Sequence, residues 1–92
     1  MAQELIKAAA QIFNADPMAE NRKRKNADAR FAVFAALRQR GMTMHAIGMT
    51  LNKDHSTVIY GLKVHSNLMQ TDAVYRKRYE RLTFENKETN KL

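Results

Sequence analysis

The chain has no cysteine, and it has one proline and three glycines among its 92 residues. Without cysteine, neither disulfides nor thiolate zinc sites can stabilise a small domain, so the fold must depend on packing. The longest uncharged stretch, residues 41–52, has 12 residues, whereas a membrane helix needs about 18. No basic stretch precedes an apolar core near Glu4, so a secretory signal is not expected. We therefore expect a cytoplasmic protein without a membrane partner.

The residues that are present have the composition of a globular domain. Hydrophobic residues make up 45% of the chain and charged residues 27%, and a chain of this length folds as one domain. Neither strand-like alternation nor a glycine-rich phosphate loop nor a repeat is found. We predict one all-α domain over residues 1–86, followed by a flexible polar tail over residues 87–92.

The distribution of charge is the first indication of function. The chain has 16 Lys or Arg residues against 9 Asp or Glu, a net charge of +7. Residues 22–63 alone hold nine basic and two acidic residues, whereas residues 1–21 hold one and three. We expect a polyanion to dock on the middle of the chain, although a solvated basic face would give the same composition.

Helical spacing of apolar residues predicts a first helix over residues 3–14. Asp16 followed by proline then favours a short turn of helix over residues 17–20. The basic run at 22–25 interrupts the helical pattern, because four adjacent cations repel one another in a helix. We expect a loop or a frayed helix end there, facing an anion.

Polar side chains that can accept hydrogen bonds from free backbone N–H groups predict where the later helices begin. These candidate caps are Asn26, Thr43, Asp54 or Ser56, and Asp72. Gly41 has the position of a left-handed C-terminal stop, and Gly48 allows close backbone approach within the short helix after Thr43. The last helix should end near Asn86, with Val74 among its packing residues.

The helices between Phe31 and Met69 follow the order of a helix-turn-helix, in which the longer, second helix enters the major groove of DNA. The first turn of such a helix meets base edges and needs short polar side chains. The four residues that begin this helix have that character, namely Asp54, His55, Ser56 and Thr57. Capping alone would explain Asp54 and Ser56, but neither His55 nor the nearby basic residues.

These residues also carry a family resemblance. The segment MHAIGMTLNKDHSTVIYGLK, residues 44–63, resembles the signature of the C-terminal DNA-binding domain, domain IV, of the bacterial replication initiator DnaA. That family has an Ile-Gly pair before an Asp-His-Thr-Thr-Val motif, matched here by residues 47–48 and 54–58. The likeness runs from about Glu4 to Leu82. It includes a leading helix and a basic loop, and it implies a small helical domain with a helix-turn-helix.

The resemblance implies a role for each matching residue. Asp54, His55 and Ser56 would read bases in the major groove, and Thr57 would touch a base methyl or a phosphate. The basic loop would enter the minor groove, with Arg22 foremost and Arg24 second, flanked by Lys23 and Lys25. Phosphate contacts are expected from Arg30, Arg38, Thr43, Lys53 and Lys63.

The chain departs from the family pattern in the turn after Leu51, which is shorter than the family's Gly-Gly-Arg connection. His45 also replaces a common proline, and Ser56 replaces a threonine. The GxxxxGK[ST] motif of the initiator's ATPase is absent from these residues. The resemblance implies a DNA target like a DnaA box, the initiator's binding site. Because the ATPase motif is absent, DNA melting is not expected.

We expect a nucleoid-associated monomer that binds double-stranded DNA and regulates replication or transcription, in the manner of a phage or plasmid protein. Neither enzyme activity nor a cofactor is expected. The alternative is an adaptor that docks a replication or transcription protein.

Two further sets of residues have a structural interpretation. The histidines at 45, 55 and 65 are ten residues apart and predicted on separate helices, so no metal site is expected, and His65 is interpreted as a partly buried, hydrogen-bonded residue. Four cations of the last helix could be a second phosphate contact or a solvated face, namely Arg76, Lys77, Arg78 and Arg81.

Overall fold

The computed structural model describes residues 2–21 and 23–85, and all regular secondary structure in them is helical. The chain forms α1 (Ala2–Phe13), α2 (Arg24–Gln39), α3 (Met44–Leu51), α4 (His55–Thr71) and α5 (Ala73–Glu85). The predicted all-α fold is thus confirmed. The predicted tail, residues 87–92, lies outside the described residues. No helix in the described part of the chain is both long and apolar enough to span a membrane.

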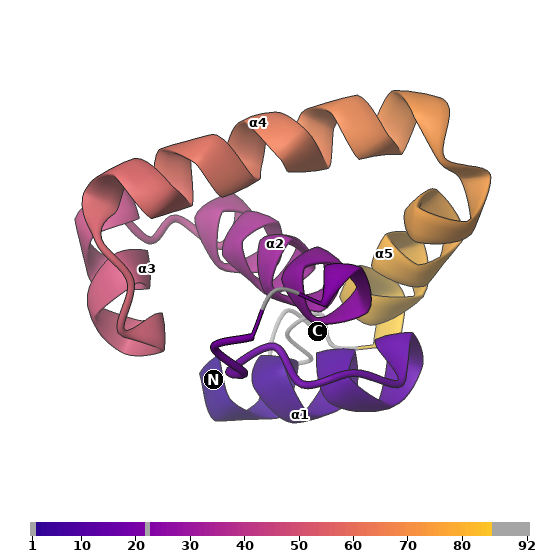
Figure 1. The fold of residues 1–92 in the computed structure, drawn as a ribbon, viewed down its shortest axis with the longest axis horizontal. Coiled ribbons are helices and arrows are strands. Elements are labelled where there is room, and N and C mark those ends of the chain that lie inside the picture. Colours follow the sequence, from indigo (N-terminus) through magenta and orange to yellow (C-terminus); the bar gives the residue numbers. More distant parts are fainter. Residues whose placement is uncertain (1, 22, 86–92) are drawn as a thin grey trace, which may run out of the picture.

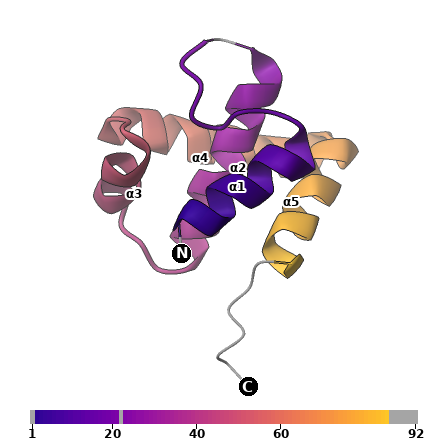
Figure 2. The same cartoon turned by 90° about the horizontal axis from the view of Figure 1, so that it is seen from below.

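Helix α2 lies at the centre of the fold. Figure 1 shows α4 along one side of it and α1 along the other, with α3 and α5 at opposite ends of α4, and Figure 2 shows the same order from below. Contacts join α2 to each of the other four helices. Residues 29–37 are accordingly buried without interruption, and all of them except Arg30 are apolar.

Gly61 determines how closely α4 approaches α2. A Cβ atom at this position would lie 2.6 Å from the ring of Phe34 and 2.7 Å from the ring of Phe31. Real Cβ atoms do not approach other atoms so closely, so the two helices can cross here only because residue 61 has no side chain. This role of Gly61 was not predicted from the sequence.

The predicted starts of the later helices are confirmed at three of the proposed caps. The Thr43 side chain accepts a hydrogen bond from the Ala46 N–H group (3.1 Å), Asp54 from Thr57 N–H (2.9 Å), and Asp72 from Tyr75 N–H (3.0 Å). Gly41 has a φ of +98°, the left-handed backbone expected for a helix stop. Val74, predicted to pack, is instead 58% exposed.

Two predictions about the segment before α2 are wrong. In place of a helical turn over residues 17–20, residues 16–19 form a single hydrogen-bonded turn, in which Asp16 accepts from Met18 N–H through its side chain and from Ala19 N–H through its carbonyl. Asn26 is not a cap, since α2 already begins at Arg24 with Lys23 as its N-cap residue. The Asn26 side chain is buried and bonds to this segment instead.

Candidate nucleic-acid interface

A tight connection joins α3 to α4. Asn52 adopts a left-handed backbone with φ of 57°, and Lys53 N–H donates to the Gly48 carbonyl at 2.8 Å. A Cβ atom on residue 48 would lie 2.5 Å from the Lys53 carbonyl oxygen, which confirms the close approach predicted for Gly48. The start of α4 is therefore fixed relative to α3.

The first turn of α4 presents polar side chains to solvent. Asp54, His55 and Ser56 are exposed, and Thr57 is half-buried. Oδ1 of Asp54 accepts hydrogen bonds from Thr57 N–H at 2.9 Å and from the Ser56 hydroxyl at 3.1 Å. These bonds, chiefly those from Thr57, lower the pKa of Asp54. The capping hydrogen bonds therefore favour the ionised form of Asp54, and an ionised carboxylate can accept a hydrogen bond from the exocyclic amine of a base.

The basic run is divided between a loop and a helix. Lys23 precedes α2, whereas Arg24 and Lys25 lie in its first turn, and all three are exposed. The Arg24 guanidinium pairs with carboxylate oxygens of Asp28 at 3.6 Å and Asp72 at 3.5 Å, yet its side chain remains 73% exposed. Arg22, the residue expected to lead into the minor groove, lies outside the described residues.

Arg30 has a different environment from the one expected of a phosphate contact. It is only 8% exposed. Its Nε atom donates to the Pro17 carbonyl at 3.0 Å, and its Nη2 atom donates to the Ala19 carbonyl. Burial lowers its pKa. These contacts give Arg30 a structural role in holding the segment between α1 and α2, which does not fit the predicted phosphate contact.

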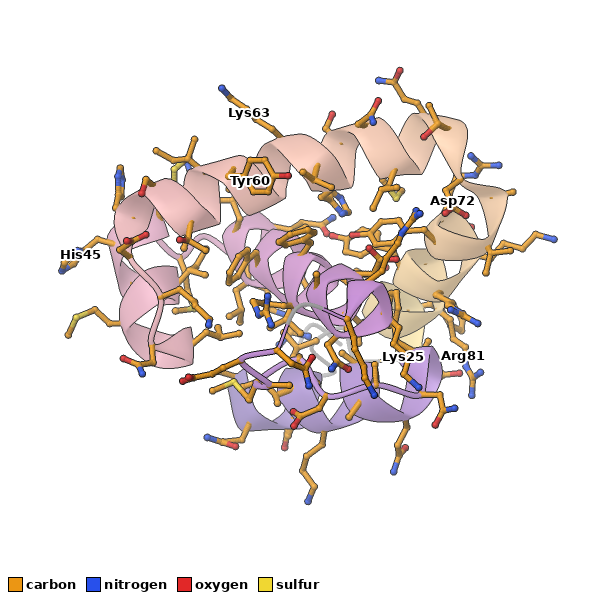
Figure 3. All side chains as sticks on the ribbon, in the orientation of Figure 1. Lys25, His45, Tyr60, Lys63, Asp72 and Arg81 are labelled. Atoms are coloured by element: carbon orange, nitrogen blue, oxygen red, sulfur yellow. The ribbon has the colours of Figure 1, made fainter. Side chains whose placement is uncertain are left out.

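The other predicted phosphate contacts remain available on the surface. Arg38 is exposed, and its Nη1 atom donates to the Met42 carbonyl at 2.9 Å. Thr43 caps α3 with its oxygen as acceptor, so its hydroxyl hydrogen is not used by the cap. Lys63 is exposed and points away from the helices in Figure 3. Lys53 is half-buried.

Lys53 lines a groove of about 550 Å³ that lies between α4 and the basic segment formed by Lys23, Arg24 and Lys25. The groove is lined by Glu20, Asn21, Arg24, Ala27, Asp28, Arg30, Phe31, Lys53, Tyr60 and Val64.

Tyr60, labelled in Figure 3, projects from α4 into this region. It is 62% exposed and packs edge-on against Phe31, with ring centroids 6.1 Å apart. Tyr60 was not predicted as a site residue, although its position between the apolar residues 59 and 62 indicates an aromatic side chain off the buried face of the helix.

No protein-family model matches the chain, and no curated protein or solved structure matches it significantly. The resemblance to the DnaA domain therefore rests on the quoted residues and their spacing alone.

His65 has the environment predicted for it. Its Nδ1 atom lies 2.6 Å from the Tyr75 hydroxyl, and its ring packs against Tyr79 at a centroid distance of 4.4 Å. Burial lowers the pKa of His65.

The prediction that all three histidines fall on separate helices is wrong, because His55 and His65 both lie on α4. Ten residues of helix nevertheless separate them by about 15 Å. Within residues 2–21 and 23–85, no three His, Asp or Glu side chains are grouped so that they could hold a metal ion.

The cations of α5 contact the protein itself. Arg76 donates to the Met69 carbonyl at 2.9 Å, Arg81 to Glu85 at 3.0 Å, and the Arg78 guanidinium lies 5.8 Å from the centre of the Phe13 ring. Lys77 is exposed. These contacts favour the interpretation of α5 as a solvated face over a second phosphate site.

Proposed function

We propose that this protein binds double-stranded DNA sequence-specifically at sites like the DnaA box, as a regulator of replication or transcription without ATPase chemistry. The observation that carries the proposal is the first turn of α4, where Asp54, His55 and Ser56 are exposed together at a rigid helix start. Rigid presentation matters because a base contact is specific only when its geometry is held.

The groove between the basic segment and α4 supports the same proposal. A duplex bound with α4 in its major groove and the basic segment in the neighbouring minor groove has a sugar-phosphate backbone between the two. The basic side chains of Arg24 and Lys53 line this groove, together with the acidic Glu20 and Asp28. Cations on both walls would pair with the phosphates of this backbone.

Gel shifts with two duplexes test the proposal, one containing a DnaA box and one with the same bases scrambled. We expect tighter binding to the box. His55→Ala should weaken box binding by about 1 to 3 kcal/mol, roughly 5-fold to 150-fold, with little change on the scrambled duplex. Arg38→Ala should weaken both alike, because a phosphate contact carries no base information.

The matched control is Gln70→Ala, an exposed change in the last turn of the same helix. It should bind both duplexes as the unaltered protein does. Equal affinity for box and scrambled DNA would refute sequence specificity. If His55→Ala changed neither affinity nor preference, the first turn of α4 would not be the base-reading element. Absence of binding to any duplex would favour the adaptor alternative.

A further inference from the structure

The segment between α1 and α2 is held in place by two buried polar side chains of α2. Figure 2 shows residues 14–21 of this segment rising on one side of the helices. Asn26 is 5% exposed and Arg30 is 8% exposed, and they are the buried polar or charged residues of the described part of the chain. Burial of such groups is unfavourable unless they are hydrogen-bonded. The hydrogen-bond partners of Asn26 and Arg30 therefore indicate the role of these two side chains.

Asn26 connects both ends of this segment. Its Oδ1 atom accepts a hydrogen bond from Asp16 N–H at 2.8 Å, and its Nδ2 atom donates to Oδ1 of Asn21 at 2.9 Å. The same Asn21 oxygen accepts from Lys23 N–H at 3.2 Å. One buried amide thus links the entry of the segment to the first described residue of the basic run.

Arg30 holds the middle of the segment. Its guanidinium donates to the carbonyls of Pro17 and Ala19, on the two sides of Met18. These donors lie at fixed positions of a planar group, so the two carbonyls are held at a fixed separation. Lysine has one nitrogen at the end of a flexible stem and cannot reproduce this geometry.

We propose that Asn26 and Arg30 are positioning residues for DNA binding, which hold residues 16–21 and Lys23 in one conformation so that Lys23 is presented beside Arg24 and Lys25 of the first turn of α2. This inference rests on the proposed function. Its physical basis is that a segment ordered before binding loses less conformational entropy when it meets the duplex. Arg30 would then act through its neighbours, without touching a phosphate.

Substitutions of Arg30 separate positioning from direct contact. Arg30→Lys keeps the charge but loses the two-carbonyl geometry, and Arg30→Met loses both. If Arg30 positions the segment, both variants should lose affinity for the box duplex to a similar degree, on the order of tenfold. Box affinity of Arg30→Lys close to that of the unaltered protein, with a large loss in Arg30→Met, would overturn the inference in favour of a charge contact.

Asn26→Ala tests the same segment without any change of charge. In the otherwise unaltered protein it should weaken box binding. In a protein that already carries Lys23→Ala and Lys25→Ala it should have a smaller effect, because Lys23, the side chain that the segment positions, is already gone. Equal losses in the two backgrounds would overturn the inference, since a general loss of stability acts independently of these lysines.

Amide hydrogen exchange of the free protein provides a readout that needs no DNA. Asn26→Ala should speed exchange at Asp16 and Lys23, whose N–H groups belong to this network, while amides of buried Val33 and Phe34 stay protected. Unchanged exchange at Asp16 would overturn the inference. Circular dichroism should be used to check that each variant keeps the helical content of the unaltered protein. If Arg30→Met does not fold, the Asn26→Ala measurements alone decide the inference.

Failure of the inference differs from failure of the proposed function. If the unaltered protein prefers the box but the Asn26 and Arg30 variants bind equally well, only the inference falls. If the unaltered protein binds no duplex, both fall.

Discussion

At Gly61, α4 crosses α2 where even a methyl group would meet the rings of Phe31 and Phe34. Glycine inside a helix is normally unfavourable relative to alanine by about 0.5–1 kcal/mol. The close approach reverses this preference, because overpacking a core costs about 1–3 kcal/mol. Whether glycine or alanine is more stable at position 61 is thus decided by contacts with Phe31 and Phe34, which lie about 30 positions earlier in the sequence.

Gly61→Ala should therefore lower the free energy of unfolding by about 1 kcal/mol or more, despite the better helix propensity of alanine. Thermal unfolding followed by circular dichroism should show a fall in Tm of several degrees, about 4–8 °C per kcal/mol for a domain of this size. Ser66→Ala, on the exposed face of the same helix, is the control and should leave Tm unchanged or slightly raised. A rise in Tm for both variants would contradict the steric argument.

Among the helices, α5 is attached to α4 through a titratable contact. Tyr75 and Tyr79 of α5 pack on His65 of α4, and the Tyr79 hydroxyl also donates to Oε1 of Gln39 on α2 at 3.0 Å. Burial lowers the pKa of His65 from its ordinary 6.5 and raises that of Tyr75. Both shifts favour the neutral side chains in the folded protein.

The lowered His65 pKa predicts a loss of stability in mild acid. A group whose pKa is lower in the folded state contributes fully above its unfolded pKa, near 6.5, and loses that contribution as pH falls below it. Urea unfolding between pH 7.5 and 5.5 should show a decline in the free energy of unfolding. His65→Gln, which cannot titrate, should show a shallower decline. Parallel curves for the two proteins would exclude His65 as the cause.

Helix starts and stops were predictable from sequence where their causes are local. Thr43, Asp54 and Asp72 each bond to an amide three residues ahead, so the pattern is contained in four consecutive letters. Asn26 was misassigned for the opposite reason, because its partner Asp16 lies ten residues back. A side chain that can cap a helix can equally pin a distant segment, and only the tertiary structure distinguishes the two.

The candidate site likewise has features that the sequence predicts and features that depend on tertiary packing. The exposed first turn of α4 follows from a cap and a helix direction, both visible in the sequence. The burial of Arg30 and the exposure of Tyr60 do not, because each depends on how α4 and the segment after α1 pack against α2. The phosphate contact predicted for Arg30 came from the family resemblance, which does not report whether the side chain is buried.

For the molecule as a whole, the net charge of +7 predicts DNA binding that weakens steeply with salt. Each neutralised phosphate contributes a slope of about 0.9 in a plot of log affinity against log salt concentration. Alanine variants of Arg38, Lys53 and Lys63 should each lower this slope by about 0.9 if each contacts one phosphate.

Lys7→Ala is the control for this measurement. It removes the same charge from an exposed position on α1, on the far side of α2 from α4 (Figure 1). Its slope should match that of the unaltered protein. Equal reductions in all four variants would show a diffuse charge effect and no localised contacts.

If the protein binds DNA as proposed, the pairing of Arg24 with Asp28 and Asp72 would affect its discrimination among polyanions. These two carboxylates act as built-in counterions, so approach of Arg24 to a phosphate is an exchange of one anionic partner for another. An isolated phosphate offers little advantage in that exchange. Under the proposed function, a duplex that also engages α4 would compensate for the loss of these ion pairs, so the two acids would weaken purely electrostatic association with other polyanions.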